Sequence, residues 1–169
     1  EALRYYLESL KLFESTGNKR HIARIFVGIG MLYQTMGQLS NAEKYLNKAL
    51  TTNSQAKDGE ERTNLRALHT LANIKGMTGN YEAAIKLDSI GLQRCRISGN
   101  EYYASTFYDN IANCKMYSGS YPEAEIYFKK CLLIDSSFGS KKQMADTYLN
   151  LGTLFLMQKK YDAAIGYLR

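Results

Sequence analysis

Asparagines that recur at a fixed interval are the side chains best suited to binding chemistry in this sequence. Asn113 follows Asn73 at the same interval at which Asn150 follows Asn110. Asparagine is unfavourable inside helices, so helix propensity does not explain these two columns. A carboxamide offers both a donor and an acceptor, and it can pair with the backbone of an extended peptide. The same groups could instead bond to neighbouring helices or to water, and the residues alone leave both interpretations open.

The sequence holds no residue set that is typical of an enzyme. A nucleophile with its base, a pair of catalytic carboxylates and a phosphate-binding loop are all missing at any recognisable spacing. The pair Gly28-x-Gly30 falls within a predicted helix and follows no strand, so it does not indicate a phosphate site. The three cysteines form no CxxC pair, and there are only two histidines. We therefore predict that the protein is not an enzyme and uses no cofactor or metal.

Regularly spaced glycines define the elements that must position the asparagines. An almost constant interval of about 20 residues, typical of a repeat architecture, separates Gly17, Gly37, Gly59, Gly79, Gly99, Gly119 and Gly139. Each interval is the length of a helix plus a turn, and glycine tolerates the left-handed conformation that ends a helix. The pattern predicts helix pairs with a period of about 40 residues, more than roughly 70% helix and essentially no strand.

Small residues at a fixed register support the same period. Ala2, Ala42, Ala84, Ala124 and Ala164 recur with the period of the helix pairs. Large residues precede the last four alanines by three positions, and small residues such as Ala49, Gly91 and Cys131 follow seven positions later. Such large-and-small spacing lets two antiparallel helices approach closely, because the small residue receives the neighbouring helix.

The stretch from Phe26 to Leu50 resembles the tetratricopeptide repeat, with Ile29-Gly30, Tyr33, Gly37 and Ala42 at matching intervals. The resemblance covers nearly the whole chain, although the period here is several positions longer than the family's usual one. It implies an all-α fold, a right-handed superhelical solenoid of antiparallel helix pairs. Asp88 stands where an apolar residue is expected, and Lys159 replaces the eighth glycine.

The expected solenoid is a single domain over residues 1–169. Its repeats are 19–58, 59–98 and 99–138, with partial repeats at 1–18 and 139–169. The first helix of each pair, here called first-type, is expected near 19–36, 60–78, 100–118 and 141–158. The second helix of each pair, called second-type, is expected near 1–15, 39–56, 81–98, 121–136 and 161–169.

The resemblance also implies that the first-type helices line a concave groove, where asparagines of peptide-binding family members hold the ligand backbone. The expected groove residues are Arg24, Met31, Arg66, His69, Asn73, Asp109, Asn110, Asn113, Tyr117, Asp146 and Asn150. The basic members come early in the chain and the two aspartates late. This order predicts that acidic groups of a ligand bind at one end and basic groups at the other.

Charge and hydropathy narrow the partners to proteins or extended peptide segments. The net charge is +6, and the basic residues form no continuous stripe for a nucleic acid. No apolar run approaches the roughly 18 residues of a membrane span. A sensor or regulatory arm of a larger signalling protein, such as a kinase or transcription regulator, is the alternative to a binding scaffold. A helical-repeat RNA binder fits less well, because its period is shorter and the groove here carries two aspartates.

The sequence begins and stops within expected second-type helices, so we expect further repeats on both sides. Leu7, Leu10, Ala164 and Leu168 are then expected to be partly exposed. Solenoids need polar capping units, and none is visible here, so self-association through these ends is expected. The compartment stays open, with the cytoplasm favoured over export.

Overall fold

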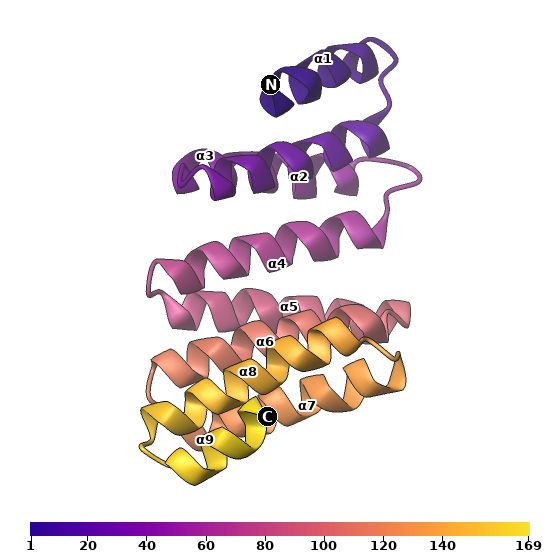
Figure 1. Cartoon of the computed structure of the whole chain (residues 1–169). Coiled ribbons are helices and arrows are strands. Elements are labelled where there is room, and N and C mark those ends of the chain that lie inside the picture. Colours follow the sequence, from indigo (N-terminus) through magenta and orange to yellow (C-terminus); the bar gives the residue numbers. More distant parts are fainter. The chain divides into compact units, whose positions relative to one another are not determined.

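The computed structural model describes all 169 residues, and 83% of them lie in nine α-helices with no strand (Figure 1). The helices are α1 (Ala2–Ser15), α2 (Lys19–Thr35), α3 (Leu39–Ser54), α4 (Glu61–Met77), α5 (Tyr81–Ser98), α6 (Glu101–Tyr117), α7 (Tyr121–Ser137), α8 (Lys141–Met157) and α9 (Tyr161–Leu168). Each bound agrees closely with its predicted range, so the all-helical fold and its period are confirmed. No helix is long and apolar enough to span a membrane.

Left-handed glycines end most of these helices, as their interval predicted. Gly99, for example, has φ 67° and its amide N–H donates to the carbonyl oxygen of Cys95. Gly59 is the exception, because it is not among the glycines with positive φ. It lies in the longer α3–α4 loop, where an added Cβ would come within 2.4 Å of the Asn53 carbonyl oxygen. The prediction that Gly59 ends a helix is therefore wrong: this glycine allows a close backbone contact instead.

Lys159 takes the place of the eighth glycine and keeps the glycine conformation, with φ 59°. A side chain in the left-handed region costs roughly 1–2 kcal/mol, part of which glycine loses again through its greater freedom in the unfolded chain. We therefore expect Lys159→Gly to raise the free energy of unfolding by about 0.5–1 kcal/mol in urea denaturation. The control Lys142→Gly, at a helical position in α8, should lower it. A Lys159→Gly protein no more stable than the parent would contradict this reasoning.

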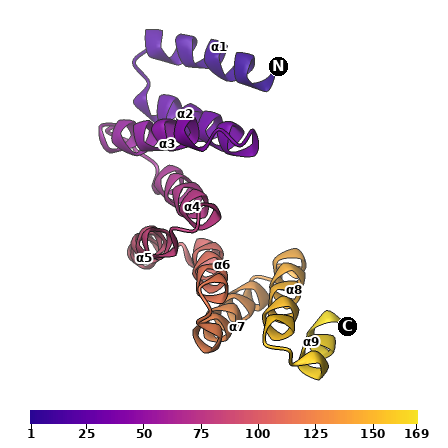
Figure 2. The ribbon, with the colours of Figure 1, turned by 90° about the vertical axis from the view of Figure 1, so that its left-hand side faces the viewer.

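The chain divides into two compact units, Glu1–Ile74 and Lys75–Arg169, with the boundary inside α4. In the first unit, α2 lies against both α1 and α3 (Figure 2). Gly30 of α2 allows the approach of α3, because an added Cβ would lie 2.7 Å from the Leu46 side chain. At the start of α2, the Nε of Arg20 donates a 2.9 Å hydrogen bond to Glu60.

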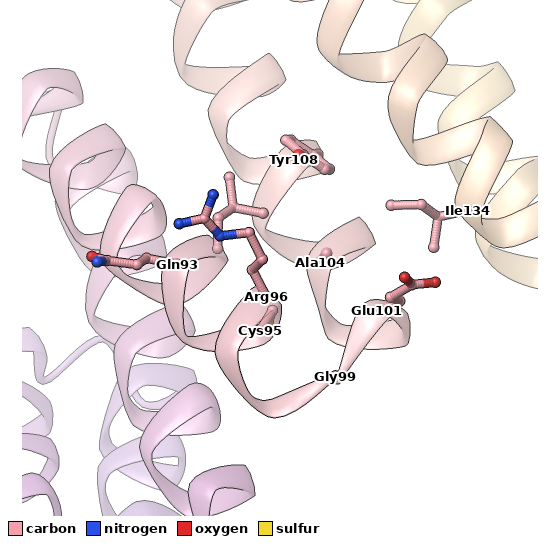
Figure 3. Close-up of a pocket in the computed structure, with 9 residues that line it drawn as sticks. Gln93, Cys95, Arg96, Gly99, Glu101, Ala104, Tyr108 and Ile134 are labelled. Atoms are coloured by element: carbon pink, nitrogen blue, oxygen red, sulfur yellow. The ribbon is translucent and has the colours of Figure 1, made fainter.

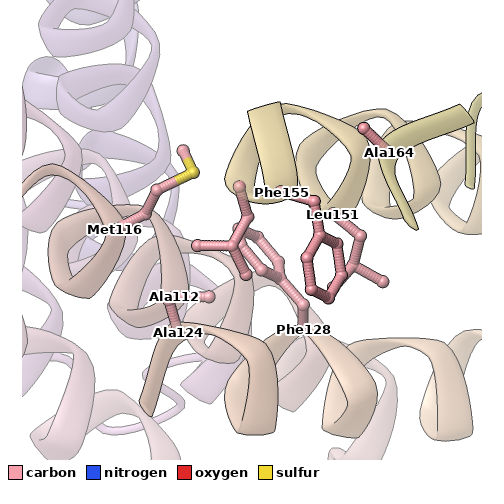
Figure 4. Close-up of a cluster of buried hydrophobic side chains, with 8 residues drawn as sticks. Ala112, Met116, Ala124, Phe128, Leu151, Phe155 and Ala164 are labelled. Carbon is pink, nitrogen blue, oxygen red and sulfur yellow. The ribbon is translucent and has the colours of Figure 1, made fainter. Parts of the chain in front are cut away.

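In the second unit, neighbouring helices from α5 to α9 pack consecutively, and α6 also contacts α8. Part of its core is a buried cluster that α6, α7, α8 and α9 share (Figure 4). The cluster consists of Ala112, Met116, Ala124, Phe128, Leu151, Leu154, Phe155 and Ala164. Ala42, Ala84 and Ala124 are all fully buried, so these alanines lie at close helix contacts as their register predicted.

The two terminal helices only partly match the expected exposure. Leu7 and Leu168 are exposed, at 38% and 47%, and Leu10 is half-buried. Ala164 is fully buried, so the prediction that it is partly exposed is wrong. The reason is that α9 packs on α8, where the rings of Phe155 and Tyr167 stack with centroids 5.4 Å apart. Self-association through the ends stays a prediction.

Candidate functional site

Two arginines from consecutive first-type helices, α2 and α4, line one pocket in the first unit. The pocket has a volume of about 360 Å³. Its lining residues are Tyr6, His21, Arg24, Ile25, Gly28 and Arg66. Arg24 and Arg66 are exposed residues, and both belong to the predicted groove. Two guanidinium groups at one opening suit a carboxylate or a phosphate, which arginine binds through paired hydrogen bonds.

A glycine and a sulfur contact shape this pocket. At Gly28, an added Cβ would lie 2.6 Å from the Tyr6 ring, so the glycine lets the aromatic ring of α1 reach the surface of α2. The Nη2 of Arg66 lies 3.3 Å from the Sδ of Met31, another predicted groove residue, which is 37% exposed. This contact holds the Arg66 guanidinium of α4 beside α2. Two side chains of the pocket are therefore placed by contacts within the unit.

His69 and Asn73 follow Arg66 along α4. His69 is half-buried, and burial lowers its pKa below the usual 6.5. It is therefore neutral at pH 7 and adds no positive charge, contrary to its expected role beside the arginines. The Oδ1 of Asn73 accepts a 2.8 Å hydrogen bond from the Nε2 of Gln34 on α2. Asn73 thus pairs with a neighbouring helix through its acceptor, and its NH₂ group is the part that a ligand can use.

In the second unit, Asp109 of α6 brings two predicted asparagines together. Its Oδ1 accepts from the Nδ2 of Asn150 on α8, and its Oδ2 accepts from the Nδ2 of Asn113, both at 3.0 Å. Burial raises the pKa of Asp109 to about 6; the Asn150 bond opposes this shift, whereas nearby Asp135 and Asp146 add to it. The group is mostly ionised at pH 7, and it orients both amides with their NH₂ groups toward it.

Asn110 does not lie on the exposed face of α6. Only 8% of the residue is exposed, and its Nδ2 donates a 2.8 Å hydrogen bond to the Oδ2 of Asp88 on α5. The expectation that Asn110 contacts a peptide is therefore wrong, because the residue belongs to the α5–α6 contact. Tyr117 and Asp146 are exposed, the former at 60%, so both are accessible from solvent.

The four asparagines thus all form hydrogen bonds inside the protein. Three of them bond to another helix: Asn73 to α2, Asn110 to α5 and Asn150 to α6. Asn113 bonds to Asp109 one turn earlier in its own helix. Bonding to neighbouring helices was one of the two interpretations that the sequence left open, and three of the four asparagines do bond in this way.

A larger pocket in the second unit lies where the sequence predicted no site. It has a volume of about 540 Å³ and opens between the end of α5, the start of α6 and α7 (Figure 3). Its lining residues are Leu92, Gln93, Cys95, Arg96, Gly99, Glu101, Ala104, Tyr108 and Ile134. The lining mixes apolar groups with charges of both signs, so it favours no single class of ligand. None of these residues belongs to the groove that the sequence predicted.

Solved structures with the same fold include one in complex with a peptide. The apo form of RapI superposes with a TM-score of 0.84 and 19% identity, over 98% of this chain and 60% of that one. BtubC from P. vanneervenii gives a TM-score of 0.81 and 19% identity, over 98% and 67%. The Rap conjugation gene regulator of plasmid pLS20, in complex with the Phr* peptide, superposes with a TM-score of 0.77 and 16% identity. The match covers 86% of this chain and 40% of that one. At these identities the likeness establishes the fold alone.

The chain therefore spans about two thirds or less of the length of these structures. No curated protein sequence is similar enough to count as a relative. The sequence profile described as tetratricopeptide repeat matches residues 1–55, 22–89 and 102–169, which together cover most of the chain. The repeat period, the helix pairs and this match agree, and the chain belongs to the tetratricopeptide repeat family.

Proposed function

We propose that this chain is a non-catalytic module that binds an extended peptide or protein segment through its first-type helices. The observation that carries the proposal is the pocket of the first unit, where Arg24 and Arg66 lie at one opening. Folds of this family are generally scaffolds rather than enzymes. The peptide in the structure of the pLS20 regulator supports a ligand of this kind for a chain of the same fold.

Each unit offers charges of its own sign to a ligand. An acidic side chain or a terminal carboxylate would bind Arg24 and Arg66 in the first unit. A basic side chain would bind near Asp109 and Asp146 in the second unit, because acidic side chains attract it. The NH₂ group of Asn73 and the Oδ1 of Asn113 would pair with the peptide backbone, since their partners within the protein occupy the opposite end of each amide.

A sensor or regulatory arm of a larger signalling protein is the second candidate function. It is favoured by the pLS20 structure, which is that of a gene regulator and of which this chain covers 40%. Peptide binding would serve either role, because a regulator can use it to sense a signal. The full-length sequence distinguishes the two: an output domain attached to the repeats would establish the regulatory role.

A peptide-library screen on the wild-type protein, followed by titration of Asn73→Ala with Asn113→Ala, tests backbone recognition. Each lost hydrogen bond should cost about 0.5–1.5 kcal/mol, so the double variant should bind the selected peptide roughly 5- to 150-fold more weakly. Asn41→Ala with Asn47→Ala is a matched control, because both residues are exposed on the second-type helix α3. Circular dichroism should show the same helix content in all three proteins. Equal affinity in both double variants would place the peptide on another surface, such as the larger pocket.

A further inference from the structure

Three aspartates of the second unit lie buried or half-buried on consecutive helices. Asp88 of α5 is 0% exposed and Asp135 of α7 is 1% exposed. In each of these two residues the Oδ1 atom is buried and has no hydrogen-bond partner. Asp109 of α6 is half-buried and faces Asp135. Burial of a charged carboxylate without full hydrogen bonding is costly, so the protonation state of this group of residues matters for packing.

Asp88 has the environment least suited to a charge. Other repeats have Leu46 and Phe128 at the equivalent position, both fully buried. The Oδ2 of Asp88 accepts one hydrogen bond, from Asn110, and the charged group that faces it from α6 is Asp109. The thiol of Cys114, also on α6, is close enough for Asp88 to influence it. Burial raises the pKa of Asp88 to about 8; the Asn110 bond opposes this shift and Asp109 adds to it.

Asp109 and Asp135 meet further acidic groups where α6, α7 and α8 pack together. Asp109 faces Asp135 from α7 and Asp146 from α8, and its donors are Asn113 and Asn150. Burial raises the pKa of Asp135 as well, and the nearby side chain of Ser105 on α6 opposes this shift. The Cys131 thiol of α7 lies beside both aspartates. The charged groups that face Asp109 are thus acidic, so ionisation of one aspartate opposes ionisation of the next.

We propose that Asp88, Asp109 and Asp135 form a proton-linked latch, which holds α5 to α8 together while the aspartates keep protons and loosens this packing as they ionise. The hydrogen bonds Asp88–Asn110 and Asp109–Asn150 connect α5 to α6 and α6 to α8 in either state. What changes is the charge that the interior must hold. The charged groups that face these carboxyls are themselves acidic, so a bound proton is what neutralises each of them.

The direction of the pH effect follows from the raised pKa values. In the unfolded chain an aspartate ionises near 3.8, whereas Asp109 and Asp88 in the native state hold their protons to about pH 6 and pH 8. Between pH 3.8 and its native pKa, each of these aspartates is protonated in the native state and ionised in the unfolded state. Stability is therefore greatest at low pH and falls as pH rises. For each proton that only the native state holds, an increase of one pH unit raises the unfolding equilibrium constant by up to roughly tenfold.

Urea unfolding of the whole chain between about pH 6.5 and 8.5, followed by circular dichroism, tests the latch. The lowered pKa of His69 acts only near the lower end of this range, and it acts equally in the wild type and the variant, so it cancels in their comparison. We expect the wild-type unfolding constant to rise with pH by several-fold more than that of Asp88→Asn, which cannot ionise. Asp162→Asn, an exposed aspartate of α9 in the same unit, is the control and should follow the wild type.

Equal pH dependence in wild type and Asp88→Asn would overturn the proposal. If that variant does not fold, the wild-type protein alone still gives an answer through ¹³C NMR of the assigned Asp88 and Asp109 carboxyl carbons. Midpoints near 8 and 6 support the latch. A midpoint near 3.8 for Asp88 would overturn it, because the residue would then be charged throughout the physiological range.

Discussion

Replacement of both Arg24 and Arg66 by alanine should weaken the binding of an acidic peptide by roughly 10²- to 10⁴-fold. A hydrogen bond to a charged group contributes about 1.5–3 kcal/mol, and the two guanidinium groups share one opening in the first unit. The probe is an acidic peptide from the library screen, and calorimetric titration gives its dissociation constant. The same peptide with each Asp replaced by Asn should bind the wild-type protein weakly. Its affinity for the Arg24 and Arg66 variant should be only slightly lower, because the peptide no longer carries the charges that the arginines bind.

Long-range attraction between a basic protein and an acidic peptide must be separated from binding in the pocket. Arg4→Ala with Lys11→Ala removes the same number of positive charges from α1, at exposed positions that do not line the pocket. This control should weaken binding only slightly, and mainly at low salt. If the control loses as much affinity as the Arg24 and Arg66 variant, the pocket is not where the acidic group binds.

The helices and their turns were predictable because their causes are local. Backbone sterics determine where the left-handed glycines occur, and contact with one neighbouring helix determines where the buried alanines occur. Both recur with the period. Lys159 shows the limit of this logic, since the turn keeps its geometry without the glycine. Gly59 shows the other limit, because a glycine at nearly the right interval serves a different contact in a longer loop.

The candidate site was predictable only in part, because its members come from more than one kind of helix. Arg24 and Arg66 share a first-type register, so the period placed them on one face. Tyr6 and His21 were missed, since their place in the pocket depends on how α1 packs on α2 at Gly28. The neutral state of His69 was missed too, because burial of one side chain leaves no trace in a repeat pattern.

The asparagine columns show why a correct signal was not enough to assign a role. Helix propensity identified these positions as unusual, and all of them do form specific hydrogen bonds. Their partners are set by tertiary contacts: Asn110 bonds to Asp88 of the preceding helix, and Asn150 bonds to Asp109 of the preceding helix pair. Asp88 interrupts an otherwise apolar column, and this interruption was the one sequence feature that marked the buried polar contact.

Gly91→Ala should lower the free energy of unfolding by roughly 1–3 kcal/mol, although alanine is the better helix former by about 0.8–1 kcal/mol. An added Cβ at this position in α5 would lie 2.3 Å from the ring of Phe107 on α6. Phe107 is fully buried, so its ring has little room to move aside. The steric cost should therefore exceed the gain in helix propensity, and urea denaturation followed by circular dichroism measures the difference.

Gly166→Ala is the matched control, because it makes the same change in a helix of the same unit. Nothing lies within 4 Å of an added Cβ at Gly166 in α9, so only helix propensity acts there. This variant should gain stability, by at most about 1 kcal/mol. The two substitutions should thus have opposite signs, which a general effect of Gly→Ala on the unfolded chain cannot produce. A stabilising Gly91→Ala would mean that α5 and α6 approach less closely than the ring of Phe107 requires, and the register that places small residues at this contact would then be wrong for that pair.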